Sequence, residues 1–177
     1  SIRYLPLTIG LGQRPVAEHR CPQQGGIEVI LIVIRFIPRQ RLDLSVNILT
    51  NQAVNTKQIK VFGGAQKRPN IHIDDVTDLY VKSLEWPEEV IDGNVFNAGY
   101  DNQTVTELAE TVRRRVGEDV GIVTTPTDDP RSYHISSAKI QRELGFVPKY
   151  STDDAVGDLV AAFGAGKIPN AMTDKCY

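Results

Sequence analysis

The segment at residues 59–80, IKVFGGAQKRPNIHIDDVTDLY, contains the local signals that decide the fold. We interpret it as a strand at 59–62, a turn at Gly63 and Gly64, and a second strand at 71–73. A helix is predicted to follow from about 75 to 84. The two aspartates at its start can accept hydrogen bonds from unpaired backbone N–H groups, and they favour the positive end of the helix dipole. This order of elements indicates a mixed α/β chain.

The rest of the chain repeats the alternation of strands and helices. Thr104 and Glu107 form a capping box, which predicts a helix that continues to Gly117. Residues after Gly164 are small and polar, and we expect them to fray. The other predicted elements are strands at 27–34, 95–97 and 122–125 and helices at 41–56, 137–144 and 151–163. This alternation is typical of the α/β class.

Composition excludes several classes of function. The 177 residues carry a net charge of −2 without a basic run, which argues against nucleic acid or an anionic membrane surface as partner. No apolar stretch reaches the length of a membrane span, and no secretion signal is recognisable. Cys21 and Cys176 lie near opposite ends without CxxC spacing. That pattern indicates a reducing cytoplasm, with neither a disulfide framework nor a zinc site.

Four segments occur in an order that is typical of one enzyme family. The glycine turn, Gln-x-Arg and Ile-His-Ile-Asp-Asp run of 59–80 come second in this order. The other three are PRQRLDLSVNILTNQAV at 38–54, NVFNAGYDNQTVTELAETV at 94–112 and RSYHISSAKIQRELGFVPKYSTDDAVGDLVAAF at 131–163. Over roughly residues 37–163 the chain therefore resembles the extended short-chain dehydrogenases, a family of NAD-dependent nucleotide-sugar epimerases and dehydratases.

The resemblance implies a partial Rossmann-type sheet plus a small α/β substrate-binding domain. Residues 1–40 are expected to be a remnant of the dinucleotide-binding domain. Residues 41–177 would mainly form the nucleotide-sugar domain, with some segments returning to the Rossmann sheet. Family members use NAD or NADP to oxidise a nucleoside-diphosphate sugar transiently. A Tyr-x-x-x-Lys pair does the acid–base work, because residues at i and i+4 share a helix face and the ammonium lowers the tyrosine pKa.

The sequence departs from the family pattern near its beginning. When the chain is aligned on Ala17 and Glu18, Gly10 occupies the position of the family tyrosine and Arg14 that of the lysine. Gly10 has no side chain to move a proton, so we assign no catalytic residue. The Gly-x-x-Gly-x-x-Gly turn of the family is absent as well. These departures suggest a fragment, a decayed copy or a misread sequence upstream of residue 40, and we do not expect this chain alone to bind NAD or NADP tightly.

The resemblance also implies four substrate-binding residues. Arg68 is expected to reach the diphosphate, whose oxygens suit a planar guanidinium, and Arg131 to face a phosphate or the ribose. Tyr133 would stack or hydrogen-bond near the nucleotide, and Asn47 would contact the sugar or diphosphate. Each has a plainer alternative: an exposed arginine, a surface salt bridge, a half-buried tyrosine and, slightly favoured, a helix-surface asparagine. His72 is interpreted as structural, since no partners at metal-ligand spacing are evident.

Three functions stay open from the sequence. The first is a nucleotide-sugar epimerase or dehydratase homologue that keeps its substrate half and is inactive alone. The second is a non-catalytic binding or interaction module, and the third is a ligand-free protein. The apolar strands predict an exposed sheet edge, which would favour a homodimer or aggregation. If Arg68 and Arg131 bind one diphosphate, they must also converge in the fold.

Overall fold

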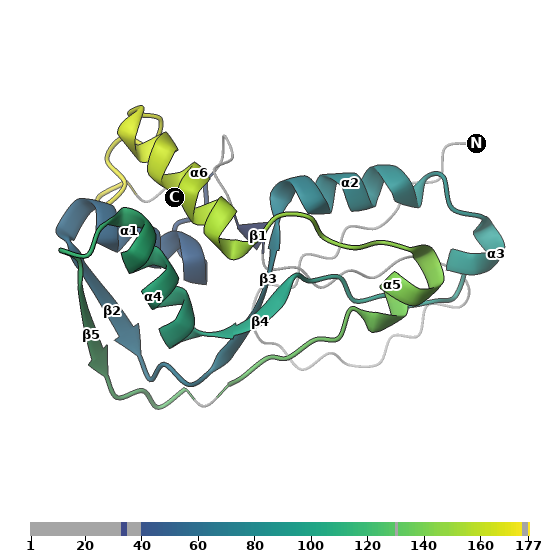
Figure 1. Cartoon of the computed structure of the whole chain (residues 1–177), viewed down its shortest axis with the longest axis horizontal. Helices are drawn as coiled ribbons and strands as arrows, with labels where there is room; N and C mark the ends of the chain where they lie inside the picture. Colours follow the sequence, from purple (N-terminus) through teal and green to yellow (C-terminus); the bar gives the residue numbers. More distant parts are fainter. Residues whose placement is uncertain (1–32, 35–39, 130, 175–176) are drawn as a thin grey trace.

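The computed structural model describes residues 33–34, 40–129, 131–174 and 177. Within these ranges the chain forms an α/β structure, which confirms the predicted class. The elements are, in chain order, β1 (Val33–Ile34), α1 (Ser45–Thr56), β2 (Gln58–Phe62), β3 (Lys67–His72), α2 (Ile73–Ser83), α3 (Glu88–Ile91), β4 (Asp101–Thr104), α4 (Val105–Val116), β5 (Gly121–Thr125), α5 (Ala138–Leu144) and α6 (Thr152–Gly164) (Figure 1).

Two small sheets organise these elements. β2 and β5 run parallel, in a register that joins Gln58 to Gly121 and Phe62 to Thr125. In the other sheet β3 is central, because it pairs with β1 in parallel and with β4 in antiparallel orientation. β3 directly follows the turn after β2, so the Gly63–Gly64 turn connects the two sheets.

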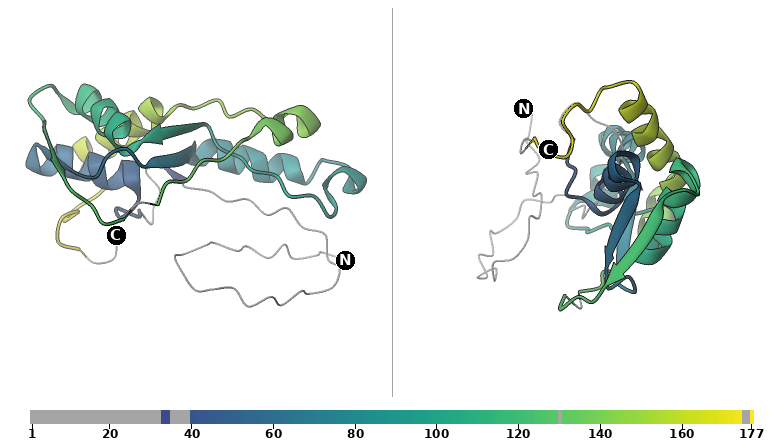
Figure 2. Two further views of the ribbon diagram at one scale, coloured as in Figure 1. Left: turned by 90° about the horizontal axis from the view of Figure 1, so that it is seen from below. Right: turned by 90° about the vertical axis from the view of Figure 1, so that its left-hand side faces the viewer.

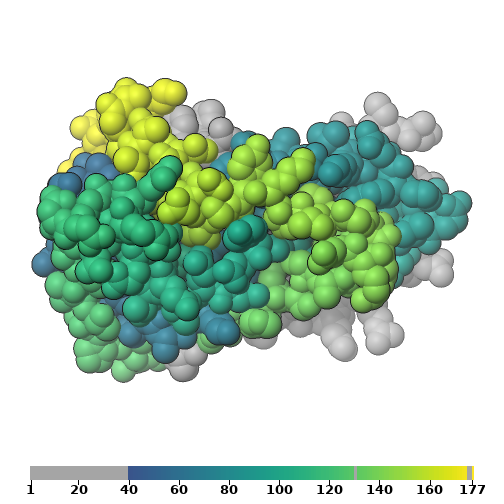
Figure 3. Space-filling model, viewed as in Figure 1, coloured from purple at the N-terminus to yellow at the C-terminus, as the bar shows by residue number. Residues whose placement is uncertain are grey.

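Each half of the molecule has its own hydrophobic core. Helices α1, α4 and α6 pack on one another, and α1 and α4 also pack on β2, burying residues such as Val46, Leu108 and Leu159. The second core joins α2, α5 and the segment before β4, with Phe96 and Phe146 at its centre. Figure 2 shows this division along the long axis, and in Figure 3 the surfaces of α4 and α6 continue into that of α5.

Local signals place the helix ends where they were predicted. At the start of α4, Thr104 accepts a hydrogen bond from the backbone N–H of Glu107, whose carboxylate accepts one from the backbone N–H of Thr104 in return. Ser151 and Asp154 form a second capping box at the start of α6. Gly145 ends α5 in the left-handed conformation, φ 65°, which glycine adopts without steric cost.

Two predictions about the elements are wrong. Residues 95–97 form no strand, because their backbone groups pair with no strand in the described part of the chain, although the side chain of Phe96 is fully buried. The segment after Gly164 is not frayed as a whole. Ile168 is buried in the first core, and the carbonyl oxygen of Ala171 accepts a hydrogen bond from Asn51.

Smaller differences concern the boundaries. Of the strand predicted at 71–73, residues 71 and 72 form the end of the longer β3. Ile73 instead begins α2, two positions earlier than expected. Of the strand predicted at 27–34, only Val33–Ile34 belongs to the described residues. No helix in the described part of the chain is long and apolar enough to cross a membrane.

Candidate functional site

The start of β3 lies beside a loop that follows β5. The backbone N–H of Lys67 donates to the hydroxyl of Ser132 at 2.9 Å, and the backbone N–H of Tyr133 donates to the carbonyl oxygen of Lys67 at 3.1 Å. These two bonds hold residues 131–133 against β3, although the partners are more than 60 positions apart in sequence. The fold therefore brings two of the predicted binding segments together.

Arg68 lies at the centre of the junction between the start of β3 and residues 131–133. Its Nη1 donates to the carbonyl oxygen of Lys67 at 2.9 Å and to that of Arg131 at 2.8 Å. The guanidinium carbon lies 5.4 Å from the ring centre of Tyr133, within the range of a cation–π contact. Three of the four residues expected to bind substrate, Arg68, Arg131 and Tyr133, are thus gathered at one junction.

Asp129 supplies a negative charge next to Arg131. Nε and Nη2 of Arg131 donate to its two carboxylate oxygens at 2.7 and 2.6 Å, which is a bidentate pair. Hydrogen bonds from the Arg131 side chain and backbone, with smaller contributions from the charges of Arg131 and Arg68, lower the pKa of Asp129 to about 2. The same pair raises the pKa of Arg131 above its ordinary value. The site therefore holds two cations and one anion at neutral pH.

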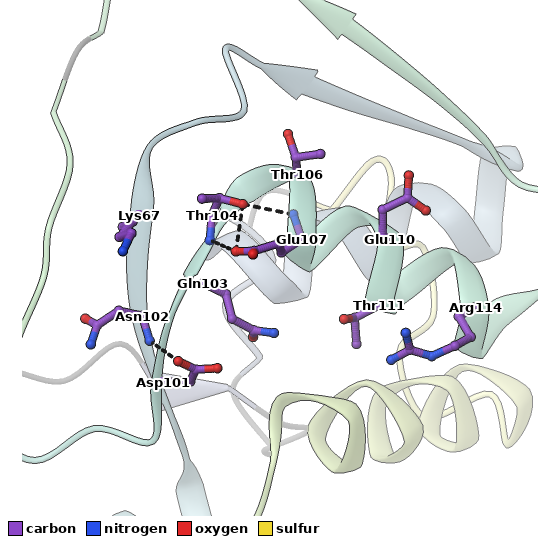
Figure 4. Close-up of a pocket in the computed structure, with 10 residues that line it drawn as sticks. All are labelled: Lys67, Asp101, Asn102, Gln103, Thr104, Thr106, Glu107, Glu110, Thr111 and Arg114. Atoms are coloured by element: carbon purple, nitrogen blue, oxygen red, sulfur yellow. Dashed lines mark hydrogen bonds between the residues drawn. The ribbon is translucent and has the colours of Figure 1, made fainter.

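A hollow of about 350 Å³ opens beside this cluster and is lined by Gly63, Ala65, Gln66, Thr127, Asp129 and Ser132. A larger hollow of about 550 Å³ is lined by residues of β4 and of α4 as far as Arg114 (Figure 4). Its lining includes three carboxylates, Asp101, Glu107 and Glu110, against two cations, Lys67 and Arg114. Among the described residues, Asp129 is the only charged one that lines the smaller hollow, so an anion at this site would depend on Arg68 and Arg131 next to the hollow rather than on its lining.

Asn47 is not part of the cluster. It lies on α1, which packs against α4, α6 and β2, and it is buried rather than on the helix surface. Its Nδ2 donates to the carbonyl oxygen of Arg41 at 2.8 Å, whereas its Oδ1 has no hydrogen-bond partner among the described residues. Gly10 and Arg14 lie outside the described residues.

His72 has a structural environment. It is buried, its Nδ1 accepts a hydrogen bond from the backbone N–H of Asp74 at the start of α2, and its ring stacks on Tyr150 with centroids 4.6 Å apart. Its Nε2 lies 3.4 Å from a carboxylate oxygen of Asp158 on α6. His72 therefore joins β3, α2 and α6. No group of three potential metal ligands occurs in the part of the chain that the structure describes.

Sequence reasoning had not assigned Asp129 and Gln66 to the site. Asp129 lies two positions before Arg131, and that spacing allows a bidentate pair in a non-helical loop. Gln66 stands out in the sequence only as the first residue of the Gln-x-Arg motif. Its contacts with a loop 63 positions later depend on the tertiary fold, so no local signal could have revealed them.

Part of the chain matches a family model, and its fold is similar to that of several solved structures. Residues 38–99 match the model of the NAD dependent epimerase/dehydratase family. UDP-glucuronic acid 4-epimerase from Bacillus cereus, solved with UDP-glucuronic acid and NAD, is similar in structure, with a TM-score of 0.64 and 23% identity. The match covers 77% of this chain and 45% of that chain. UDP-glucose 4-epimerase from Thermotoga maritima, solved with UDP-glucose, gives a TM-score of 0.64 and 25% identity. The match covers 78% of this chain and 46% of that chain.

The dTDP-glucose 4,6-dehydratase from Bacillus anthracis, in complex with NAD, gives a TM-score of 0.62 and 20% identity, over 78% of this chain and 45% of that chain. The match over residues 38–99 and the shared fold agree with the resemblance that the sequence motifs had indicated. The chain spans less than half the length of the solved structures it matches.

Proposed function

We propose that this chain is the nucleotide-sugar-binding part of an NAD-dependent epimerase or dehydratase, and that it binds the diphosphate group with Arg68 and Arg131. The observation that supports this most is the junction of β3 with residues 131–133. There the guanidinium of Arg68 donates to the backbone carbonyl oxygen of Arg131 and lies over the ring of Tyr133, although the two segments are far apart in sequence.

The chemistry of the junction suits a diphosphate. The pair with Asp129 uses Nε and Nη2 of Arg131 and does not involve its Nη1, and the side chain is 48% exposed. A guanidinium presents five N–H donors, so Arg131 can keep Asp129 and still donate to a phosphate oxygen. Tyr133, also 48% exposed, offers a ring for stacking next to Arg68.

We further propose that the sugar end of the ligand reaches Asn47. The amide oxygen of Asn47 is buried and unpaired among the described residues, and a sugar hydroxyl is a donor that could satisfy it. We propose residues 41–177 as mainly the nucleotide-sugar domain and residues 1–40 as a remnant of the dinucleotide-binding domain. The cytoplasm is the proposed compartment, on the evidence of the two distant cysteines.

We do not expect the described residues to hold a dinucleotide cofactor. A dinucleotide needs a glycine-rich turn that leads into a helix, with free N–H groups at the helix start for the pyrophosphate. Here the Gly63–Gly64 turn leads into β3, and the first N–H groups of α4 and α6 face the carboxylates and hydroxyls of their own capping boxes. We therefore assign NAD or NADP to the family and propose that this chain alone does not bind it tightly.

A second function is favoured by one specific observation. Gly10 at the position of the family tyrosine removes the proton acceptor, which is compatible with a non-catalytic binding or interaction module. Such a module would use the same arginines without any reaction. We propose a homodimer as its assembly, because apolar side chains such as Val81 and Leu84 at the end of α2 are largely exposed.

Arg68→Ala and Arg131→Ala should each weaken the binding of UDP-glucose about ten- to a hundredfold, because each removes charge-assisted hydrogen bonds worth roughly 1.5–3 kcal/mol. Isothermal titration calorimetry on the wild type and both variants measures this. Arg142→Ala is the matched control, since Arg142 is an exposed arginine on α5 that pairs with its neighbour Glu143. Equal affinities in all four proteins would refute the proposed site.

A further inference from the structure

Gln66 makes a bridge between the glycine turn and the loop that carries Arg131. Its Oε1 accepts a hydrogen bond from the backbone N–H of Gly64 at 2.7 Å. Its Nε2 donates to the carbonyl oxygen of Phe62 at 3.1 Å and to that of Asp129 at 3.3 Å. One side-chain amide thus contacts the end of β2, the turn and the loop, with both its donor and its acceptor in use.

The turn is shaped to make room for this amide. Gly63 has φ 76°, and a Cβ placed on it would lie 2.5 Å from Nε2 of Gln66 and 2.5 Å from Cγ2 of Thr127. Only glycine fits there without displacing one of the two side chains. The backbone N–H of Gly63 also donates to the carbonyl oxygen of Thr125, which joins the turn to the end of β5.

These contacts connect Gln66 to both arginines. Gln66 binds the carbonyl oxygen of Asp129, and the carboxylate of Asp129 holds the guanidinium of Arg131. On the other side Gln66 is two positions before Arg68, whose Nη1 donates to the carbonyl oxygen of Arg131. The distance between the two guanidinium groups therefore depends on the register between the turn and the loop.

We infer that Gln66 is a positioning residue, which fixes that register so that Arg68 and Arg131 reach the same diphosphate. This inference rests on the proposed function. Gln66 itself need not touch the ligand, because its amide groups are occupied by the backbone of Phe62, Gly64 and Asp129. Its removal should weaken the contribution of the diphosphate to binding more than that of the nucleoside.

The test compares UDP with uridine, because the two probes differ only in the diphosphate. Gln66→Leu has a similar size and removes the donor and the acceptor. Gln66→Glu keeps an acceptor for Gly64 but replaces the donor with a charge that faces the carbonyl oxygen of Asp129. Gln141→Leu, on an exposed glutamine of α5, is the control. Calorimetry gives both affinities for each protein, and thermal melting reports its stability.

We expect both Gln66 variants to reduce the preference for UDP over uridine roughly three- to tenfold, as the loss of about one net hydrogen bond would do, while Gln141→Leu leaves it unchanged. A purely structural glutamine would lower the melting temperature and leave that preference intact, which would overturn the inference. If Gln66→Leu does not fold, Gln66→Glu decides alone. If the wild type does not prefer UDP, or Arg68→Ala keeps the preference, the proposed function fails and the inference with it.

Discussion

Replacement of Asp75 by alanine is expected to destabilise the protein strongly. Asp75 is buried at the start of α2, with 1% of its surface exposed. Its Oδ1 accepts a hydrogen bond from the backbone N–H of Lys149 at 2.8 Å, and its Oδ2 accepts one from that of Tyr150 at 3.0 Å. One carboxylate thus attaches the segment before α6 to α2.

Asp75→Ala would leave both N–H groups without their partner. A hydrogen bond to a charged group contributes about 1.5–3 kcal/mol, and these two bonds are only part-buried. The loss should therefore be about 2–4 kcal/mol, against a total stability of roughly 5–15 kcal/mol for a typical domain. Asp75→Asn keeps one acceptor oxygen, so its stability should fall between those of the wild type and Asp75→Ala. Urea denaturation of the three proteins measures the free energy of unfolding.

Asp78→Ala is the control for this series. Asp78 lies one turn further along α2 and forms ion pairs with Lys82 and Lys149 at the surface. Exposed ion pairs contribute little to stability, so this variant should differ much less from the wild type. If Asp75→Ala unfolds at the same urea concentration as Asp78→Ala, the carboxylate of Asp75 does not anchor the 149–150 segment.

The second large effect concerns catalysis. The 177-residue chain is expected to show no NAD-dependent turnover of UDP-glucose, because Gly10 stands where the family has its tyrosine. General acid–base catalysis typically contributes about a hundred- to ten-thousand-fold, and the cofactor would also lack its glycine-rich turn. The measurement is product analysis after incubation with NAD and UDP-glucose.

The UDP-glucose 4-epimerase from Thermotoga maritima, a structural neighbour, is the positive control in the same assay. Epimerised sugar formed by this chain at a rate comparable to that enzyme would contradict the expectation. It would also mean that another group supplies the proton acceptor. Calorimetric binding of NAD to this chain in the micromolar range would contradict the argument from the missing turn.

Elements with signals in neighbouring residues could be predicted from the sequence. The Thr104–Glu107 box indicated the start of α4 correctly, because a cap forms within a few residues, and α5 ends at 144 as predicted. The strand expected at 95–97 failed because pairing depends on a second strand, which an apolar run cannot reveal. The fraying predicted after Gly164 failed as well, since Ile168 anchors an otherwise polar segment.

For the site, the sequence could predict which residues take part but not how they contact one another. The motifs around Arg68 and Arg131 suggested a diphosphate, and the structure brings the two residues together. The pair with Asp129 and the bridge by Gln66 could not be foreseen, because both depend on how the loop after β5 meets the turn after β2. Asp75 was expected at a helix start, but its role as acceptor for the 149–150 segment exists only in the folded chain.

Isothermal titration calorimetry of UDP-glucose binding to the wild-type chain and to the Arg68→Ala/Arg131→Ala double variant tests whether the two arginines form a diphosphate site. We expect measurable binding by the wild type and none by the double variant, with both proteins folded by circular dichroism. Equal affinity in the two proteins, or no binding by the folded wild type, would contradict the assignment of this junction as a nucleotide-sugar site.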